Sequence, residues 1–239
     1  MKLTIFHTND LHGKLTQEKA ERIRELRSTG AHSLLFDSGD CIRAGNLAVP
    51  TSPDPAWELL ALAGCDCGTL GNRETHILAS AFKSKIAGAK HPLICANLRE
   101  KNGVRPLPGS ITFDIAGLTI GIVGAMVPMV TERMASRVAS AYLWDPPIPC
   151  AVAEAAKLRE SVDLLVALTH IGYKQDLTLA EQCPAFDLIL GGHSHTVLEQ
   201  PAKVGSTWIC QGGAFGAYIG RYTLDSKLRL TRAELIPLP

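Results

Sequence analysis

The sequence lacks an apolar run long enough to cross a membrane and lacks a strong excess of charge of either sign. None of its apolar runs reaches the ~18 residues that a membrane-spanning helix needs. The net charge is +1, so the overall balance gives no reason to expect a nucleic acid or an anionic membrane as a partner. We therefore expect neither, and any recognition of phosphate has to be local.

A secretory signal peptide is also missing from the start of the sequence. Lys2 leads directly into Leu3-Thr4-Ile5-Phe6, which predicts a first strand, and no apolar segment with a small-residue cleavage site comes before it. We expect a cytoplasmic protein, unless a leader has been trimmed from the sequence.

The seven cysteines show neither a disulfide framework nor the spacing of a zinc site. Their number is odd and most of them lie in apolar sequence, which favours reduced thiols in the core. Cys65 and Cys67 form one close pair, but no second pair stands at the spacing of a zinc site. We predict that these two side chains pack in the core or at the edge of a sheet.

Strands that end in polar loops alternate with helices along most of the chain. Apolar and β-branched runs predict strands at residues 3–7, 33–36, 69–70, 92–96, 162–168, 186–190 and 207–210. Periodic apolar residues predict helices at 18–29, between Pro53 and Gly64, and at 77–86, 151–161 and 176–182. Two antiparallel hairpins are predicted, at 110–123 and around 225–227.

No internal repeat, low-complexity tract or long linker divides these elements. A chain of 239 residues is long enough for one large α/β domain with a buried core, and too short for two full ones. We predict one α/β domain whose parallel and antiparallel strands are covered by helices.

Side chains of the kinds that ligate metal ions, here called metal-type side chains, stand at or just beyond the ends of five predicted strands. Ligands of open α/β sheets gather beyond the carboxyl ends of the strands, so these side chains are expected to meet. Gly191 and Gly192 precede two histidines and let the backbone come close to an ion. The predicted ligands are Asp10, His12, Asp40, Asn72, His170, His193 and His195.

Two carboxylates, one amide oxygen and four imidazoles are more ligands than one ion needs, and they suit two ions. If Asp40 bridges the ions, they can lie ~3.5–4 Å apart, an arrangement that activates water and neutralises a phosphoryl group. Mixed oxygen and nitrogen ligands without thiolate favour manganese, iron or zinc over calcium, and magnesium disfavours cages rich in imidazole. We predict two divalent ions, with manganese first and iron or zinc as the alternatives.

The order and spacing of these motifs resemble the calcineurin-like metallophosphoesterase superfamily. The motifs are Asp10-Leu11-His12-Gly13, Gly39-Asp40, Gly71-Asn72 followed by Glu74, Thr169-His170, and Gly191-Gly192-His193-Ser194-His195. The segment from Phe6 to Gly13 is most similar to the N-terminal catalytic domain of the 5′-nucleotidase and UDP-sugar hydrolase branch. The similarity runs through nearly all of the chain, including Gln211-Gly212-Gly213.

This resemblance implies a four-layer αββα sandwich of two mixed sheets flanked by helices, with a dinuclear site. It implies one ion held by Asp10, His12, Asp40 and His195, and another held by Asp40, Asn72, His170 and His193. The implied reaction is hydrolysis of small-molecule phosphomonoesters or phosphodiesters by in-line attack of metal-bound hydroxide. Nucleotides are among the candidate substrates, through an activity like that of a 5′-nucleotidase or of a cyclic phosphodiesterase.

The sequence departs from the family pattern directly after Asn72. The family usually has a histidine there and an aspartate three residues later, whereas this chain has Arg73 and His76. Arginine cannot donate a proton at neutral pH but can stabilise phosphoryl charge, and His76 could act as the acid if it reaches the site. We name both as candidate catalytic residues. The alternatives are a solvent-facing Arg73 and a catalytically weakened module that binds metal for a binding or regulatory role.

Two-domain 5′-nucleotidases also carry a C-terminal domain that contacts the base and the phosphate, and the sequence stops at Pro239, where the catalytic domain would end. We expect residues 1–239 to form a single metallophosphoesterase domain, and the nucleoside specificity of the family does not carry over. The oligomeric state stays open. Near the site, we predict a supporting role for His7 and Asp37, and a surface position for Arg43, His32 and His91.

Overall fold

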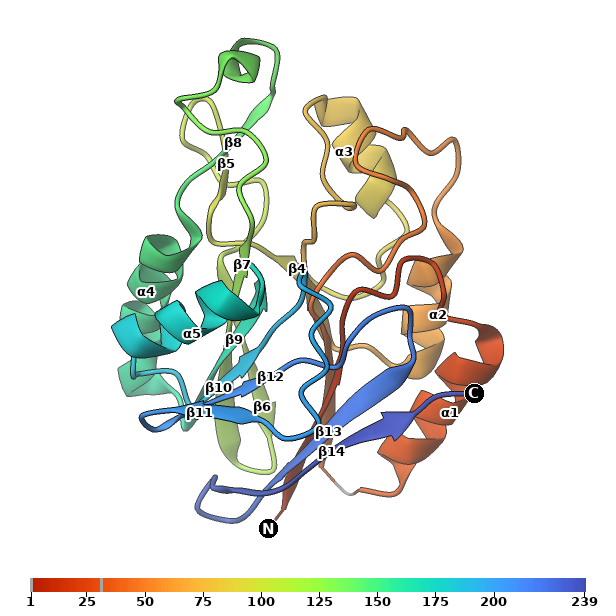
Figure 1. The fold of residues 1–239 in the computed structure, drawn as a ribbon, viewed down its shortest axis with the longest axis vertical. Helices are drawn as coiled ribbons and strands as arrows, with labels where there is room; N and C mark the ends of the chain where they lie inside the picture. The colour runs from red at the N-terminus through yellow and green to blue at the C-terminus, as the bar shows by residue number, and fades with distance from the viewer. Residues whose placement is uncertain (1, 31) are drawn as a thin grey trace.

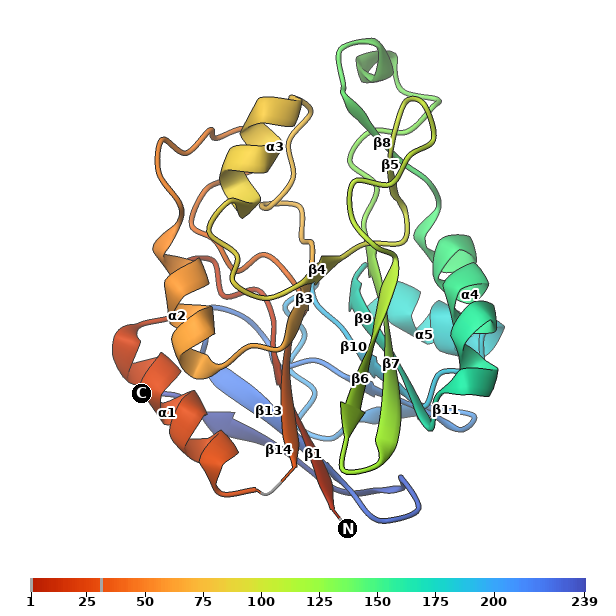
Figure 2. The same cartoon turned by 180° about the vertical axis from the view of Figure 1, so that it is seen from behind.

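Two six-stranded sheets pack face to face in the computed structural model, which describes residues 2–30 and 32–239 (Figure 1). The strand order is β14-β13-β1-β2-β3-β4 in the first sheet and β11-β12-β10-β9-β7-β6 in the second. Helices cover the outer side of each sheet, and Figure 2 shows the same layers from behind. The predicted four-layer αββα sandwich is confirmed.

The first sheet contains the N-terminal strands and the C-terminal hairpin. Its strands are β1 (Leu3–Thr8), β2 (Ser33–Asp37), β3 (Cys67–Thr69), β4 (Leu93–Ile94), β13 (Tyr218–Leu224) and β14 (Leu230–Pro237). The helices of this half are α1 (Gln17–Ser28), α2 (Pro55–Ala63) and α3 (Ala79–Ile86). Strands β1 to β4 are parallel, so their carboxyl ends lie at one edge.

The second sheet contains the middle of the chain. Its strands are β6 (Ser110–Ile115), β7 (Leu118–Met126), β9 (Leu164–His170), β10 (Leu188–Leu190), β11 (Ala202–Val204) and β12 (Thr207–Cys210). The helices are α4 (Pro147–Leu158) and α5 (Tyr173–Gln182), with short 3-10 turns η1 (Ala135–Val138) and η2 (Arg159–Ser161). A separate two-stranded sheet pairs β5 (Leu98–Glu100) with β8 (Tyr142–Trp144).

Strand β9 shows why the apolar runs form buried strands. Leu164 and Val166 point into the layer between the two sheets, whereas Leu165 and Ala167 pack on the outer side, under α4 and α5. Both faces of the strand are therefore buried, as its near-continuous apolar sequence predicts. Burying a leucine or valine side chain in this way contributes about 1.5–3 kcal/mol.

Side chains cap the N-termini of α1 and α2, the helices that are predicted at 18–29 and between Pro53 and Gly64. The side chain of Thr16 accepts from the backbone N–H of Lys19, and the side chain of Asp54 accepts from that of Ala56. Gly64 ends α2 with a left-handed φ of 79°, a conformation that glycine adopts without steric cost.

Other expectations are wrong in detail. Helix α4 begins at Pro147 instead of residue 151, because a first helical turn needs no N–H partners and so tolerates proline. Helix α3 begins at Ala79 instead of residue 77, and His76 lies in the loop before it. His91 is not a surface residue: only 7% of it is exposed, and its ring centroid lies 5.9 Å from that of Trp57.

The small β5–β8 sheet and helix α3 stand at the same end of the molecule, one on each side (Figures 1 and 2). Strands β5 and β8 are three residues long each, too short for an apolar pattern to reveal them. In the ranges that the structure describes, no helix combines the length and the apolar character that crossing a membrane requires.

Candidate metal centre

The predicted ligands lie at or just beyond the ends of β1, β2, β3, β9 and β10, and most of them have a backbone conformation that is rare for residues with side chains. Five of them have a left-handed φ, between 50° and 75°: Asp10, His12, Asp40, His193 and His195. Such strain clusters at functional sites, where the surrounding structure enforces it. Gly71 is required for the same packing, since a Cβ there would lie 2.2 Å from Oδ1 of Asp40.

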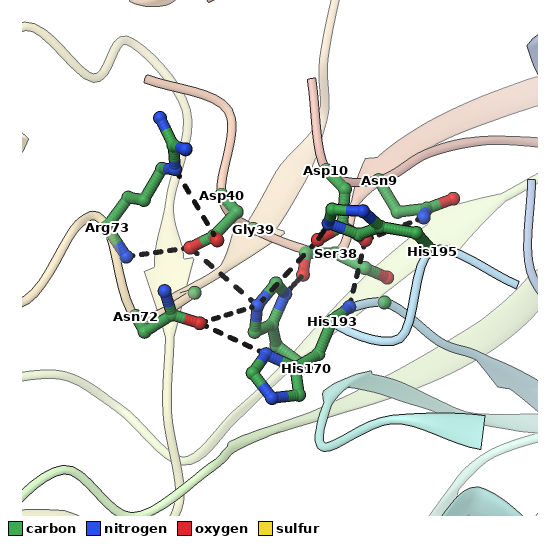
Figure 3. A network of polar contacts seen from close by, with 12 residues as sticks. Asn9, Asp10, Ser38, Gly39, Asp40, Asn72, Arg73, His170, His193 and His195 are labelled. Atoms are coloured by element: carbon green, nitrogen blue, oxygen red, sulfur yellow. Dashed lines mark hydrogen bonds and ion pairs between the residues drawn. The ribbon is translucent and has the colours of Figure 1, made fainter. Parts of the chain in front are cut away.

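One group of donor atoms gathers around Asp10 (Figure 3). Oδ1 of Asp10 lies 3.3 Å from Nε2 of His195 and 3.7 Å from Nε2 of His12. The two imidazole Nε2 atoms are 2.9 Å apart. These three side chains offer donor atoms that all lie within 4.8 Å of one another, close enough to share one ion.

A second group adjoins the first and shares Asp10 with it. Nε2 of His170 lies 3.7 Å from Oδ1 of Asp40 and 4.0 Å from Oδ1 of Asp10. The donor atoms of Asp10, Asp40 and His170 again lie within 4.8 Å of one another. Asp40 reaches the first group as well, since its Oδ2 is 3.9 Å from Nδ1 of His12.

The amide oxygen of Asn72 completes the second group. Its Oδ1 lies 3.3 Å from Nε2 of His170 and 3.1 Å from Nδ1 of His193 (Figure 3). The amide nitrogen of Asn72 donates to Oδ1 of Asn46 at 3.0 Å, and this bond turns the oxygen toward the imidazoles. The structure thus brings all seven predicted ligand side chains together.

The chemistry of these donors fits divalent ions. Oδ1 of Asp10 and Nδ1 of His12 are buried without a hydrogen-bond partner, an arrangement that is costly unless a cation is bound. Burial lowers the pKa of His12 to about 4, so its imidazole is neutral and its lone pair is available to a metal. Burial raises the pKa of Asp40 to about 7, a shift that a cation beside the carboxylate would reverse.

Known proteins resemble the chain in sequence, although no family model matches it. It is 29% identical over 243 residues to a protein of Bacillus subtilis named "Uncharacterized metallophosphoesterase YunD", covering 95% of this chain and 51% of that protein. It is also 29% identical over 294 residues to a 5′-nucleotidase of Vibrio cholerae, covering 99% of this chain and 52% of the relative. The chain thus spans about half the length of these curated relatives.

Solved structures resemble the chain in fold over its whole length. A putative 5′-nucleotidase from Staphylococcus aureus superposes with a TM-score of 0.84 at 18% identity, covering 100% of this chain and 54% of the other. The calcineurin-like phosphoesterase YfkN from Bacillus subtilis superposes with a TM-score of 0.79 at 18% identity, covering 99% and 90%. The chain has the calcineurin-like phosphoesterase fold. The resemblance that the motifs indicate is confirmed.

Within this calcineurin-like phosphoesterase fold, Glu74 holds the loop that carries Asp40. Its buried carboxylate accepts from the backbone N–H groups of Gly71 at 2.8 Å, Asp40 at 2.8 Å, Cys41 at 2.9 Å and Ile42 at 3.2 Å. The sequence marks Glu74 as part of a motif but gives no sign of this role. The four backbone groups come from two loops, and only the fold brings them to one carboxylate.

Asn9 and Gln211 hold the other loops, and sequence reasoning also missed their roles. The amide nitrogen of Asn9 donates to Oδ2 of Asp10 at 2.8 Å and to the carbonyl of Gly213 at 2.6 Å. Oε1 of Gln211 accepts from the N–H of Thr196 at 2.8 Å, and its Nε2 donates to the carbonyl of Gly192 at 2.8 Å. Gln211 thereby fixes the loop that carries His193 and His195.

The predicted supporting residues take part in the same packing. His7 is buried, with Nε2 2.8 Å from the hydroxyl of Ser38, and that hydroxyl donates to the carbonyl of Leu190 at 2.8 Å. Asp37 accepts from the Thr8 hydroxyl at 2.7 Å and from the N–H of Gly39 at 3.0 Å, so it stabilises the turn before Asp40.

Arg73 lies beside the metal-type residues instead of pointing into solvent. Its backbone N–H donates to Oδ1 of Asp40 at 2.7 Å, and its Nε is 3.9 Å from Oδ2 of the same carboxylate. Nη1 of Arg73 donates to the carbonyl of Arg43 at 3.1 Å, while the Arg43 side chain is exposed, as predicted. A guanidinium group therefore stands next to Asp40 (Figure 3).

The structure places His76 differently. Its Nδ1 accepts from the backbone N–H of Leu78 at 3.0 Å, and in residues 2–30 and 32–239 no hydrogen bond or ion pair joins it to the seven ligand side chains. With Nδ1 as acceptor, the proton of the neutral ring is on Nε2. Its role as an acid stays a prediction.

Proposed function

We propose that the chain is a metal-dependent hydrolase of small phosphomonoesters or phosphodiesters. The convergence of two carboxylates, one amide oxygen and four imidazoles at one edge of the sandwich carries this proposal. Relatives named metallophosphoesterase and 5′-nucleotidase support the reaction class. Nucleotides are accordingly among the proposed substrates.

The proposed ligand sets share Asp40. Asp10, His12, Asp40 and His195 would hold one ion, and Asp40, Asn72, His170 and His193 would hold the other, and the contacts of Asp40 with both His12 and His170 support this division. Two such ions, when bound, activate water and neutralise phosphoryl charge. Manganese is the first candidate, with iron and zinc as the alternatives, because the donors are nitrogen and oxygen without thiolate.

Side chains of the protein itself supply further charge and protons. The guanidinium of Arg73 is the cation next to Asp40, and it can stabilise the charge that a phosphoryl group develops during transfer. It cannot donate a proton at neutral pH, since arginine stays protonated in proteins. The proton for a poor leaving group would come from His76, with Nε2–H as the donor, after movement of the loop before α3.

A metal titration combined with a substrate screen tests the proposal. Purified protein would be titrated with manganese and assayed on mononucleotides, cyclic nucleotides, sugar nucleotides, p-nitrophenyl phosphate and its bis ester. We expect metal-stimulated turnover that falls at least ~100-fold in Asp40→Asn and His193→Ala, because each removes a ligand of the reacting centre. Val138→Ala, an exposed position on η1, is the control and should keep parental activity.

Circular dichroism of each variant would show that its fold is intact. The proposal is wrong if folded Asp40→Asn and His193→Ala proteins hydrolyse these esters as fast as the parent. A cytoplasmic location, and the lack of a membrane or nucleic-acid partner, stay predictions.

A further inference from the structure

Phe215 shares an unusual backbone conformation with the predicted metal ligands. Within the described ranges, non-glycine residues with positive φ number eight, and five of them are predicted ligands. Two others, Ala116 and Leu228, lie in hairpin turns, where such angles are ordinary. Phe215, with a φ of 61°, remains. A bulky side chain in this conformation is a genuine outlier and points to function.

The surrounding contacts enforce this conformation. The backbone N–H of Phe215 donates to the carbonyl of Asp10 at 2.8 Å, so the strained residue is tied to a predicted ligand. Nζ of Lys19 donates to the carbonyl of Gly216 at 2.8 Å, and the Asn9 amide donates to that of Gly213 at 2.6 Å. The loop is thus fixed on both sides of Phe215 before any substrate arrives.

The phenyl ring itself lies against the metal centre and is half exposed. Its centroid is 5.3 Å from that of the His12 imidazole and 5.5 Å from that of His195. The exposed fraction is 52%, although a ring of this size is usually buried. Fold stability does not account for a strained loop that keeps a large apolar ring in contact with water beside a polar site.

We propose that Phe215 is an apolar platform for the alcohol portion of the substrate, and that the preferred substrates carry a planar ring there. This inference rests on the proposed phosphoesterase function. A phosphoryl group bound through an ion that Asp10, His12 and His195 would hold would have its ester substituent next to the exposed face of the ring. Stacking on an aromatic side chain favours planar groups, such as aryl rings or heterocyclic bases, over alkyl groups. Phe215 is thus a specificity-determining residue.

Binding of two phosphonates, which are not hydrolysed, tests this assignment. Calorimetry would give the Kd of phenylphosphonate and of methylphosphonate for the manganese-loaded parent, Phe215→Leu and Phe215→Tyr. Leucine keeps an apolar side chain at the same strained position but removes the planar face, whereas tyrosine keeps the face. We expect the parent to prefer phenylphosphonate, and Phe215→Leu to reduce that preference about tenfold, while Phe215→Tyr retains it.

Two further measurements separate this role from a structural one. The Kd for manganese should change less than about threefold in Phe215→Leu, because the ring is not a ligand. Leu228→Gly relieves a strained residue in a hairpin turn, so it serves as the control and should leave the phosphonate preference unchanged.

The inference is overturned if the parent shows no preference for phenylphosphonate. It is also overturned if Phe215→Leu weakens both phosphonates and manganese alike, since the ring would then only orient His12 and His195. Failure of the proposed function gives a different result, in which the parent binds the phosphonates but turns over no phosphoester in the substrate screen.

Discussion

The ammonium group of Lys85 donates to the carbonyl oxygen of Arg73 at 2.7 Å inside the protein, where none of the Lys85 side chain is exposed. It also donates to the carbonyls of Gly45 at 2.8 Å, Asn46 at 3.0 Å and Thr75 at 2.9 Å. One cation therefore joins the loop that holds Asn46 to the loop that follows Asn72.

Replacing Lys85 tests this arrangement. Lys85→Met would leave these four carbonyl groups without their charged donor, and of the four bonds only that to Thr75 is fully buried. Hydrogen bonds to charged groups contribute about 1.5–3 kcal/mol, so we expect the free energy of unfolding to fall by about 3 kcal/mol. Asn46 would also hold the Asn72 amide less firmly, so the affinity for manganese should fall about tenfold. Losses of this size are typical when a residue that hydrogen-bonds to a metal ligand is removed. Urea unfolding and calorimetry would measure the two effects.

Lys83→Met, on the same helix but exposed, is the matched control. If Lys85→Met unfolds at the same urea concentration as Lys83→Met and binds manganese equally well, the ammonium group does not organise these loops.

Glu74→Gln is expected to weaken the centre through the backbone of Asp40. The substitution keeps the shape but removes the charge, and it replaces one acceptor oxygen with a donor that faces backbone N–H groups. Hydrogen bonds to charged groups contribute about 1.5–3 kcal/mol, so we expect a loss of about 2–4 kcal/mol in the free energy of unfolding. The affinity for metal should fall together with the free energy of unfolding.

Glu58→Gln on α2 is an exposed control for the same chemical change. Equal unfolding free energies for the two variants would count against the supporting role of Glu74.

Metal binding should stabilise the fold measurably. An ion that binds only the native state at a concentration 100 times its Kd contributes about 2.7 kcal/mol, which corresponds to a Tm increase of roughly 5–10 °C for a chain of this size. We expect manganese to raise the Tm of chelator-treated protein by this amount. His195→Ala should reduce the increase, since it removes a donor from the first group.

Val138→Ala serves again as the control for this thermal shift. A Tm that is the same with manganese and with chelator, in protein of parental fold, would contradict the assignment of a metal centre.

The metal-type residues could be predicted from sequence because their position depends on simple rules. Apolar runs reveal strands such as β9, and parallel strands present their carboxyl ends at one edge of a sheet. His170 and the other predicted ligands at these strand ends are therefore expected to lie close together. Lys85 and Phe215 followed no such rule. The role of Lys85 depends on carbonyls from loops 40 and 12 residues earlier in the chain. The left-handed φ of Phe215 is enforced by contacts with Asp10 and has no signature in its own residue type.

The burial of His91, which the sequence did not reveal, makes the free energy of unfolding depend on pH. Both ring nitrogens are buried without a hydrogen-bond partner, and burial lowers the pKa of His91 to about 4, from an ordinary value near 6.5. Between these two values the unfolded state binds a proton that the native state does not bind. The free energy of unfolding therefore falls as the pH drops from about 6.5 toward 4.

Each pKa unit corresponds to about 1.4 kcal/mol, so His91 should lower the free energy of unfolding by about 2 kcal/mol between pH 7 and pH 5. Over this interval, the free energy of unfolding of His91→Gln is expected to fall by about 2 kcal/mol less than that of the parent. In His32→Gln, a change at a partly exposed position, it should fall by as much as in the parent. Urea unfolding at both pH values, with chelator present to remove metal effects, gives these differences. Equal losses in all three proteins would mean that His91 is protonated in the folded state as readily as in the unfolded chain.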